Sequence, residues 1–103
     1  MLRDFILGSV KIHILYHASE EPVYGTALMQ ELARHGYHIG PGTLYPTLHT
    51  LEDDGLLQSV RKTVAGRVRR YYTITSKGHK ALEEARHAVR ELMHEILKET
   101  HHE

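Results

Sequence analysis

The chain has 103 residues, 41% of them hydrophobic and 25% charged, and its 13 basic and 13 acidic side chains give a formal net charge of zero. These values are typical of one globular domain and exclude a disordered or fibrous protein. The chain contains no cysteine, which excludes disulfides, thiolate metal sites and a cysteine nucleophile. Histidines and carboxylates are therefore the strong metal ligands that remain.

The N-terminal segment is expected to form an amphipathic helix over residues 3 to 18. Leu2, Ile6 and Val10 recur at four-residue spacing, which is the period of one helix face. Asp4 and a later lysine interrupt the apolar run, so the segment has the pattern of neither a signal peptide nor a membrane span. We therefore expect a cytoplasmic protein without a membrane partner.

The next segments predict a helix-turn-helix. A second helix fits Gly25 to Arg34, and the glycine-rich stretch 36–42 forms a tight connection. Three leucines at helical spacing then continue up to Gly55, where the third helix is expected to end. The acidic run 52–54 at this end has the pattern of a solvated helix terminus.

A basic β-hairpin is expected to follow. Leu57–Thr63 and Arg67–Ile74 are β-prone runs joined by the turn residues 64–66. Seven lysines and arginines and no acidic residue lie between Gln58 and Lys80, so the other residues hold six basic and thirteen acidic side chains. A patch of this kind attracts phosphates even in a protein of zero net charge. The alternative for any one arginine is a solvated face.

A long last helix is expected from a cap at Thr75 or Ser76 to about Thr100. Its apolar residues recur at spacings of three and four, which is the pattern of a seam against another helix. The predicted fold is thus mainly α with a small β-hairpin. We assign residues 1–75 to a winged helix-turn-helix DNA-binding domain and residues 76–103 to a C-terminal dimerisation helix.

The sequence resembles the PadR family of transcriptional regulators over most of its length. The segments that carry this resemblance are YGTALMQEL, PGTLYPTLHTLEDDGLL and RRYYTITSKGHKAL. With a single helix after the wing, the chain is similar to the small subgroup of that family. The resemblance implies a homodimer, usually a repressor, in which the first and last helices form the interface. The interface residues expected on these helices are Leu2, Ile6, Val10, Leu82, Ala85, Val89, Leu92 and Ile96.

The DNA-binding residues are expected on the third helix and the hairpin. The third helix presents polar side chains to the major groove, and the wing tracks phosphates or borders the minor groove. The residues expected to do so are Thr43, Tyr45, Thr47, His49, Arg61, Lys62, Arg67 and Arg69. For Tyr45 the alternative is packing against the second helix.

His13 and His17 lie four residues apart on the first helix, where two imidazoles can share one metal ion. Carboxylates of a partner's last helix, such as Glu91 or Glu95, are expected to complete such a site. Two other hypotheses are histidines that only pack in a core or interface and a buried imidazole that senses pH. His87 and His94 share a face with Glu91, which also suits a metal but is expected to be solvent-exposed.

The sequence therefore predicts a homodimeric transcriptional regulator that binds a palindromic operator in double-stranded DNA. It requires no cofactor, and its effector is either a transition-metal ion similar to zinc or a small aromatic compound. No motif of an enzyme is present in the sequence. The alternative is a winged-helix protein-interaction module without specific DNA binding.

Overall fold

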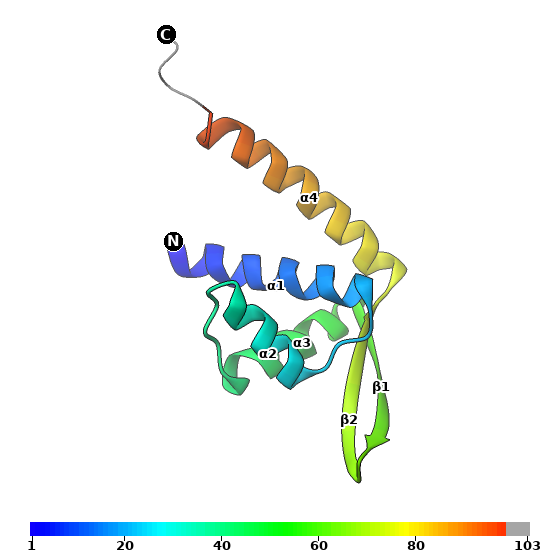
Figure 1. Ribbon diagram of the computed structural model, residues 1–103. Coiled ribbons are helices and arrows are strands. Elements are labelled where there is room, and N and C mark those ends of the chain that lie inside the picture. The colour runs from blue at the N-terminus through cyan, green and yellow to red at the C-terminus, as the bar shows by residue number, and fades with distance from the viewer. Residues whose placement is uncertain (99–103) are drawn as a thin grey trace.

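The computed structural model describes residues 1–98 and contains four helices and one hairpin within them (Figure 1). The helices are α1 (Leu2–Glu20), α2 (Gly25–Arg34), α3 (Pro41–Asp53) and α4 (Ser76–Ile96), and the strands are β1 (Leu57–Val64) and β2 (Arg67–Ile74). In Figure 1, α1, α2 and α3 form a compact body, from which the hairpin and α4 project in different directions. No helix within residues 1–98 combines the length and apolarity needed to cross a membrane.

The order of elements is the one that the sequence predicts. The bounds of α2 agree with the expected helix, whereas α1 extends beyond the expected residues 3 to 18 at both ends. α4 ends at Ile96, before the expected end near Thr100, and Thr100 lies outside the described residues. The Thr75 hydroxyl accepts a hydrogen bond from Gly78 N (2.9 Å), which identifies Thr75 as the cap of α4.

Two helix ends are fixed by glycines in the left-handed region. Gly36 has φ of +89° and Gly55 has φ of +79°, a conformation that a side chain disfavours. In each case the following residue closes the helix end, since Tyr37 N donates to Leu32 O and Leu56 N donates to Leu51 O, both at 2.9 Å. These two caps set where the chain leaves α2 and α3.

The hairpin has a shorter turn than expected. Val64 is paired with Arg67, so the turn consists of Ala65 and Gly66 alone, with φ of +52° and +77°. Positive φ at both positions is the type I′ geometry that matches the twist of a two-residue hairpin. At the base of the hairpin, Val23 and Tyr72 exchange backbone hydrogen bonds of 3.0 and 2.7 Å. The base of the wing is thus joined to the body at Tyr72.

The core lies between α1, α2, α3 and the base of the wing. Its fully buried side chains are Val10, Ile14, Leu28, Leu32, Leu44, Leu48 and Leu57. Val10 is 0% exposed and Leu82 is 3% exposed, so both belong to the core of the single chain. The chain's own side chains cover them, so both residues offer little surface to the subunit interface in which they are expected.

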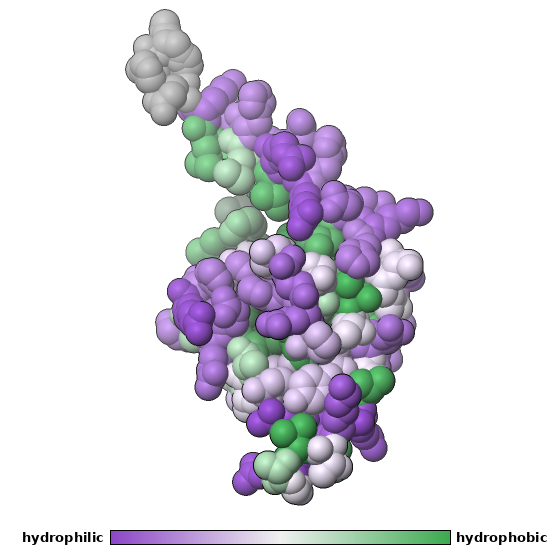
Figure 2. Space-filling view, turned by 45° about the vertical axis from the view of Figure 1, so that its right-hand side comes forward, coloured by the Kyte–Doolittle hydropathy of each residue, from purple (hydrophilic) through white to green (hydrophobic). Residues whose placement is uncertain are grey.

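The remaining interface candidates lie at the surface. Leu2, Leu92 and Ile96 are 63%, 45% and 64% exposed, and Ile6 and Val89 are also exposed, whereas Ala85 is half-buried. Figure 2 shows hydrophobic side chains along the part of the α4 arm that faces the body. The groove between α1 and α4 has a volume of about 450 Å³, and apolar side chains line most of it. Among residues 1–98, nothing closes this groove off from solvent.

Candidate nucleic-acid interface

α3 has one buried and one exposed face. Leu44, Leu48 and Leu51 are buried, whereas Thr43 and Tyr45 are exposed. Gly40 caps the helix without a side-chain hydrogen bond, and Pro41, which has no N–H, occupies the first turn. The amides of Thr43 and Leu44 both donate to Gly40 O, at 3.1 and 3.0 Å. The helix start therefore offers a phosphate fewer free amides than an ordinary helix start does.

Tyr45 is both exposed and packed against α2. Its side chain is 45% exposed, yet its hydroxyl and ring lie where a Cβ at Gly25 would stand. The glycine at the start of α2 thus makes room for the tyrosine ring of α3. The Tyr45 ring therefore packs against the second helix and is also partly exposed, so one edge of the ring is accessible to a ligand.

Thr47 and His49 are engaged within α3. The Thr47 hydroxyl donates to Thr43 O (2.7 Å), which leaves it free to accept but not to donate. The His49 Nε2 lies 3.3 Å from a carboxylate oxygen of Asp53, one helical turn later. His49 is well exposed, but Asp53 adds a negative charge beside it that opposes the approach of a phosphate.

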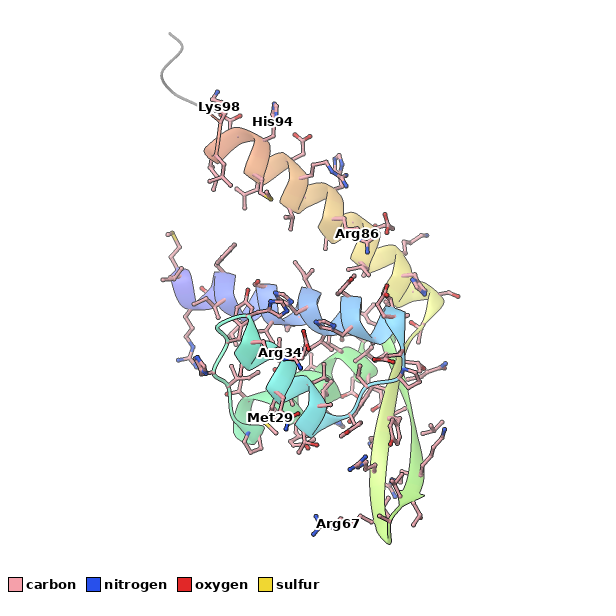
Figure 3. All side chains as sticks on the ribbon, in the orientation of Figure 1. Met29, Arg34, Arg67, Arg86, His94 and Lys98 are labelled. Carbon is pink, nitrogen blue, oxygen red and sulfur yellow. The ribbon has the colours of Figure 1, made fainter. Side chains whose placement is uncertain are left out.

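The wing presents its cations close to aromatic rings. The Arg69 guanidinium lies 4.3 Å from the centroid of the Tyr24 ring, and Lys62 Nζ lies 5.6 Å from the centroid of the Tyr71 ring. Such contacts hold long side chains in place without neutralising their charge. Arg61 and Arg67 are exposed, and Figure 3 shows Arg67 near the tip of the hairpin, extended away from the strand.

α3 and the wing meet in a shared groove. This groove has a volume of about 420 Å³ and is lined by Tyr24, Gly25, Thr26, Tyr45 and Arg67–Arg70. The structure thus brings Tyr45, Arg67 and Arg69 together, whereas Thr43, Thr47, His49, Arg61 and Lys62 are not part of this lining. An aromatic edge beside several guanidinium groups suits a strand of nucleic acid, which presents bases and phosphates together.

Glu52 is less exposed to solvent than the sequence pattern, which indicates a solvated helix end, predicts. It is half-buried, accepts a hydrogen bond from the Ser59 hydroxyl (2.6 Å), and lies 3.9 Å from an Arg70 guanidinium nitrogen. Asp53 and Asp54 are exposed as expected. Glu52 thus connects the end of α3 to both strands of the wing, and its negative charge partly offsets the charge of Arg70.

His13 and His17 lie beside a third histidine that the sequence pattern did not identify. His35 caps the C-terminal end of α2, and ligand atoms of all three imidazoles lie within 4.8 Å of one another. The sequence pattern instead predicts that carboxylates of a partner's α4 complete the set. His87, Glu91 and His94 are exposed on α4, as expected.

We predict that His13 titrates below the ordinary histidine pKa of 6.5. Burial lowers the pKa of this imidazole, the neighbouring His35 and His17 lower it further, and Glu31 raises it. The unfolded chain therefore binds a proton here more readily than the folded protein does. This contribution to stability is complete above pH 6.5 and is lost as the pH falls from 6.5 through the folded-state pKa. An NMR titration of the His13 ring that gave a midpoint at or above 6.5 would contradict this.

Comparisons with known proteins agree with this arrangement. The profile of the Transcriptional regulator PadR-like family matches residues 14–84. Transcriptional regulator Rv3488 of Mycobacterium tuberculosis is 53% identical over 96 residues, covering 93% of this chain and 90% of the relative. Both matches include α2, α3 and the wing.

Solved structures share the fold of this chain. A PadR family transcriptional regulator from Eggerthella lenta is 32% identical, with a TM-score of 0.79 over 97% of this chain and 91% of that chain. A PadR-like transcription factor from Bacteroides fragilis is 31% identical, with a TM-score of 0.78 over 87% of this chain and 88% of that chain. Fold, sequence profile and relatives agree, and the chain belongs to the PadR-like family of transcriptional regulators.

Proposed function

We propose that the protein is a homodimeric repressor that binds a palindromic operator and releases it in response to an effector. The observation that carries the DNA-binding part is the groove in which Tyr45 of α3 lies beside Arg67 and Arg69 of the wing. Residues 1–75 would form the DNA-binding part and residues 76–103 the dimerisation part. A regulator of this family has no need of a catalytic site.

On DNA, we assign α3 to the major groove and the wing to the adjacent backbone. Tyr45, with Thr43 and Thr47 on the same helix, would meet base edges or phosphates. The Thr47 hydroxyl, which donates to Thr43 O, can accept a hydrogen bond from the exocyclic amine of adenine or cytosine. Lys62, Arg61 and Arg69 would contact phosphates, and Arg67 would border the minor groove. His49 is the weakest candidate, because Asp53 lies beside it.

The dimer would form through α1 and α4. Exposed apolar side chains on both helices face the uncovered groove, and a symmetric partner would bury them. The expected contact residues are Leu2, Ile6, Ala85, Val89, Leu92 and Ile96. Two copies related by a two-fold axis present two α3 helices, which explains why a palindromic site is expected.

Arg67→Ala tests the DNA-binding part by the salt dependence of affinity. We expect the variant to bind the upstream region of its own gene and unrelated DNA more weakly, since a cation near the phosphates is lost. The slope of log affinity against log salt should become shallower by about one unit. Tyr45→Phe, in contrast, should alter the preference between operator variants more than the salt slope. Mobility shifts at several salt concentrations measure both.

Arg34→Ala is the matched control for Arg67→Ala. Arg34 ends α2, its side chain is 76% exposed, and Figure 3 shows it on the body of the molecule, away from the wing. The Arg34→Ala substitution removes the same charge and should leave the slope of log affinity against log salt unchanged. Equal effects of the two variants would show that only net charge matters. Absence of any specific shift would favour the protein-interaction module instead.

A further inference from the structure

The second cluster of functional side chains lies at the opposite end of α2 from the DNA-binding groove, between α1 and the end of α2. His13 and His17 extend from adjacent turns of α1, and His35 approaches them from the C-cap of α2. The ring centroid of His35 lies 5.0 Å from that of His13 and 6.2 Å from that of His17. The imidazoles of His13, His17 and His35 thus lie side by side in one cluster between α1 and the end of α2.

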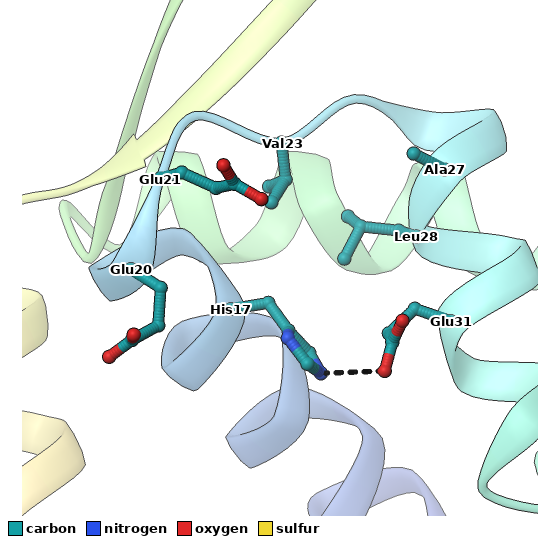
Figure 4. Close-up of a pocket in the computed structure, with 7 residues that line it drawn as sticks. All are labelled: His17, Glu20, Glu21, Val23, Ala27, Leu28 and Glu31. Carbon is teal, nitrogen blue, oxygen red and sulfur yellow. Dashed lines mark ion pairs between the residues drawn. The ribbon is translucent and has the colours of Figure 1, made fainter.

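One nitrogen in this cluster has no partner. The Nε2 atom of His17 is buried and makes no hydrogen bond to the described residues, and a carboxylate oxygen of Glu31 lies 3.9 Å away (Figure 4). A buried polar atom without a partner costs about 1–3 kcal/mol. Figure 4 shows the His17 ring pointing toward Glu31 across the gap between α1 and α2. A ligand placed there would satisfy this nitrogen.

Glu31 supplies the charge that such a ligand needs. The same carboxylate oxygen of Glu31 lies 3.1 Å from His35 Nε2 and 3.9 Å from His17 Nε2. The other oxygen lies 3.2 Å from an Arg34 guanidinium nitrogen, which fixes the orientation of the carboxylate. Three neutral imidazoles and one carboxylate present four donor groups with one negative charge to a cation.

The spacing suits a small transition-metal ion. Zinc bonds to histidine nitrogen are about 2.0–2.1 Å long, so tetrahedral ligand nitrogens lie about 3.4 Å apart. The imidazole ligand atoms lie within 4.8 Å of one another, so each pair has to approach by at most about 1.4 Å to reach this spacing. Nitrogen ligands favour zinc and similar ions over magnesium and calcium, which prefer oxygen.

We propose that His13, His17 and His35, with Glu31 as the fourth ligand, bind one divalent transition-metal ion of zinc's kind per chain. The ion would join α1 to the end of α2. α1 carries part of the apolar groove. His35 is followed by the connection to α3. Tyr37 in this connection packs edge-on against His13, with ring centroids 5.0 Å apart. Tyr37 also hydrogen-bonds to Ser9 of α1. The ion would therefore fix the angle between α1, which is proposed to form the dimer, and α3, which is proposed to enter the major groove. This regulatory consequence rests on the proposed function, whereas the metal site itself does not.

Calorimetry with zinc chloride alone tests the site. We expect the full-length protein to bind one zinc ion per chain, and His35→Ala to lower the affinity by at least about 100-fold. The matched control is His38→Ala, which removes an exposed imidazole three residues away and should bind zinc as the parent does. His101 and His102, which lie outside the described residues, are kept in every variant. Magnesium chloride is the negative control, and we expect no binding of magnesium at this site.

Cobalt gives a second readout that a purely structural role of His35 would not change. Cobalt bound in a tetrahedral nitrogen and oxygen site has intense visible absorption, which should be present in the parent and His38→Ala and lost in His35→Ala. His35→Gln keeps a hydrogen-bonding group beside Glu31, so its folding, checked by circular dichroism, separates ligand loss from misfolding. Equal zinc affinity in the parent, His35→Ala and His35→Gln would overturn the site.

The DNA arm of the experiment separates the site from the proposed function. Zinc should change operator affinity of the parent by at least about tenfold and leave that of His35→Ala unchanged. Zinc binding through His35 with an unchanged operator affinity would overturn the regulatory consequence. Zinc binding through His35 by a protein that shifts no DNA specifically would overturn the proposed function and support the metal site alone.

Discussion

Gly78→Ala is expected to lower the free energy of unfolding by about 2–3 kcal/mol, although alanine is the better helix former. Gly78 lies in the first turn of α4, and an added Cβ would overlap the backbone carbonyl oxygen of Leu56 and lie 2.6 Å from Ile74 Cγ1. The helix propensity gained is about 1 kcal/mol, which is smaller than the cost of moving a backbone oxygen. Urea denaturation monitored by circular dichroism measures the change.

Gly42→Ala is the control for that substitution. Gly42 lies in α3, where an added Cβ has no neighbour within 4 Å, so the same change should be neutral or slightly stabilising. If Gly78→Ala were as stable as the parent, α4 would have to shift on the body without cost. That result would show that the contact between α4 and the start of the wing is loosely packed.

Leu92→Glu is expected to convert the proposed dimer into monomers. Leu92 is 45% exposed in the single chain and lines the groove between α1 and α4, so a partner that fills the groove would bury a new carboxylate. Each unpaired buried charge costs several kcal/mol, and a two-fold interface contains the change twice. The dissociation constant of the dimer should rise at least about 1000-fold. Sedimentation across a range of concentrations measures the mass.

His87→Glu is the matched control on the same helix. It introduces the same side chain at an exposed position outside the groove lining and should leave the mass unchanged. Monomers in both variants would point to a general weakening of α4. A Leu92→Glu protein that remained dimeric would place the interface elsewhere and would remove the reason to expect a palindromic operator.

The regular elements could be predicted from sequence because their signals are local. Helical spacing of leucines located α3, and Gly36 and Gly55 marked the ends of α2 and α3. Val10 and Leu82 show the limit of this reasoning, since periodicity identifies an apolar face but not what covers it. Val10 fits the apolar face of the first helix and Leu82 the seam of the last, and both are covered by the chain's own core.

The candidate sites required contacts that no local pattern contains. His35 lies 18 residues after His17, and the fold alone brings it to α1. Glu52 belongs to an acidic run typical of a solvated helix end, yet it bonds to Ser59 of the wing. For polar residues near a turn, three-dimensional contacts are therefore needed to distinguish those of a functional site from those of the solvated surface.

The position of Glu52 has a consequence for changing which DNA sequence the protein reads. It lies about two helical turns after Tyr45, so the first half of α3 carries the candidate reading residues and the last turn carries the connection to the wing. Libraries that vary Thr43, Tyr45 and Thr47 but keep Glu52 should preserve the placement of the hairpin. A new operator preference can then arise in α3 by a few substitutions, without any compensating change in the strands.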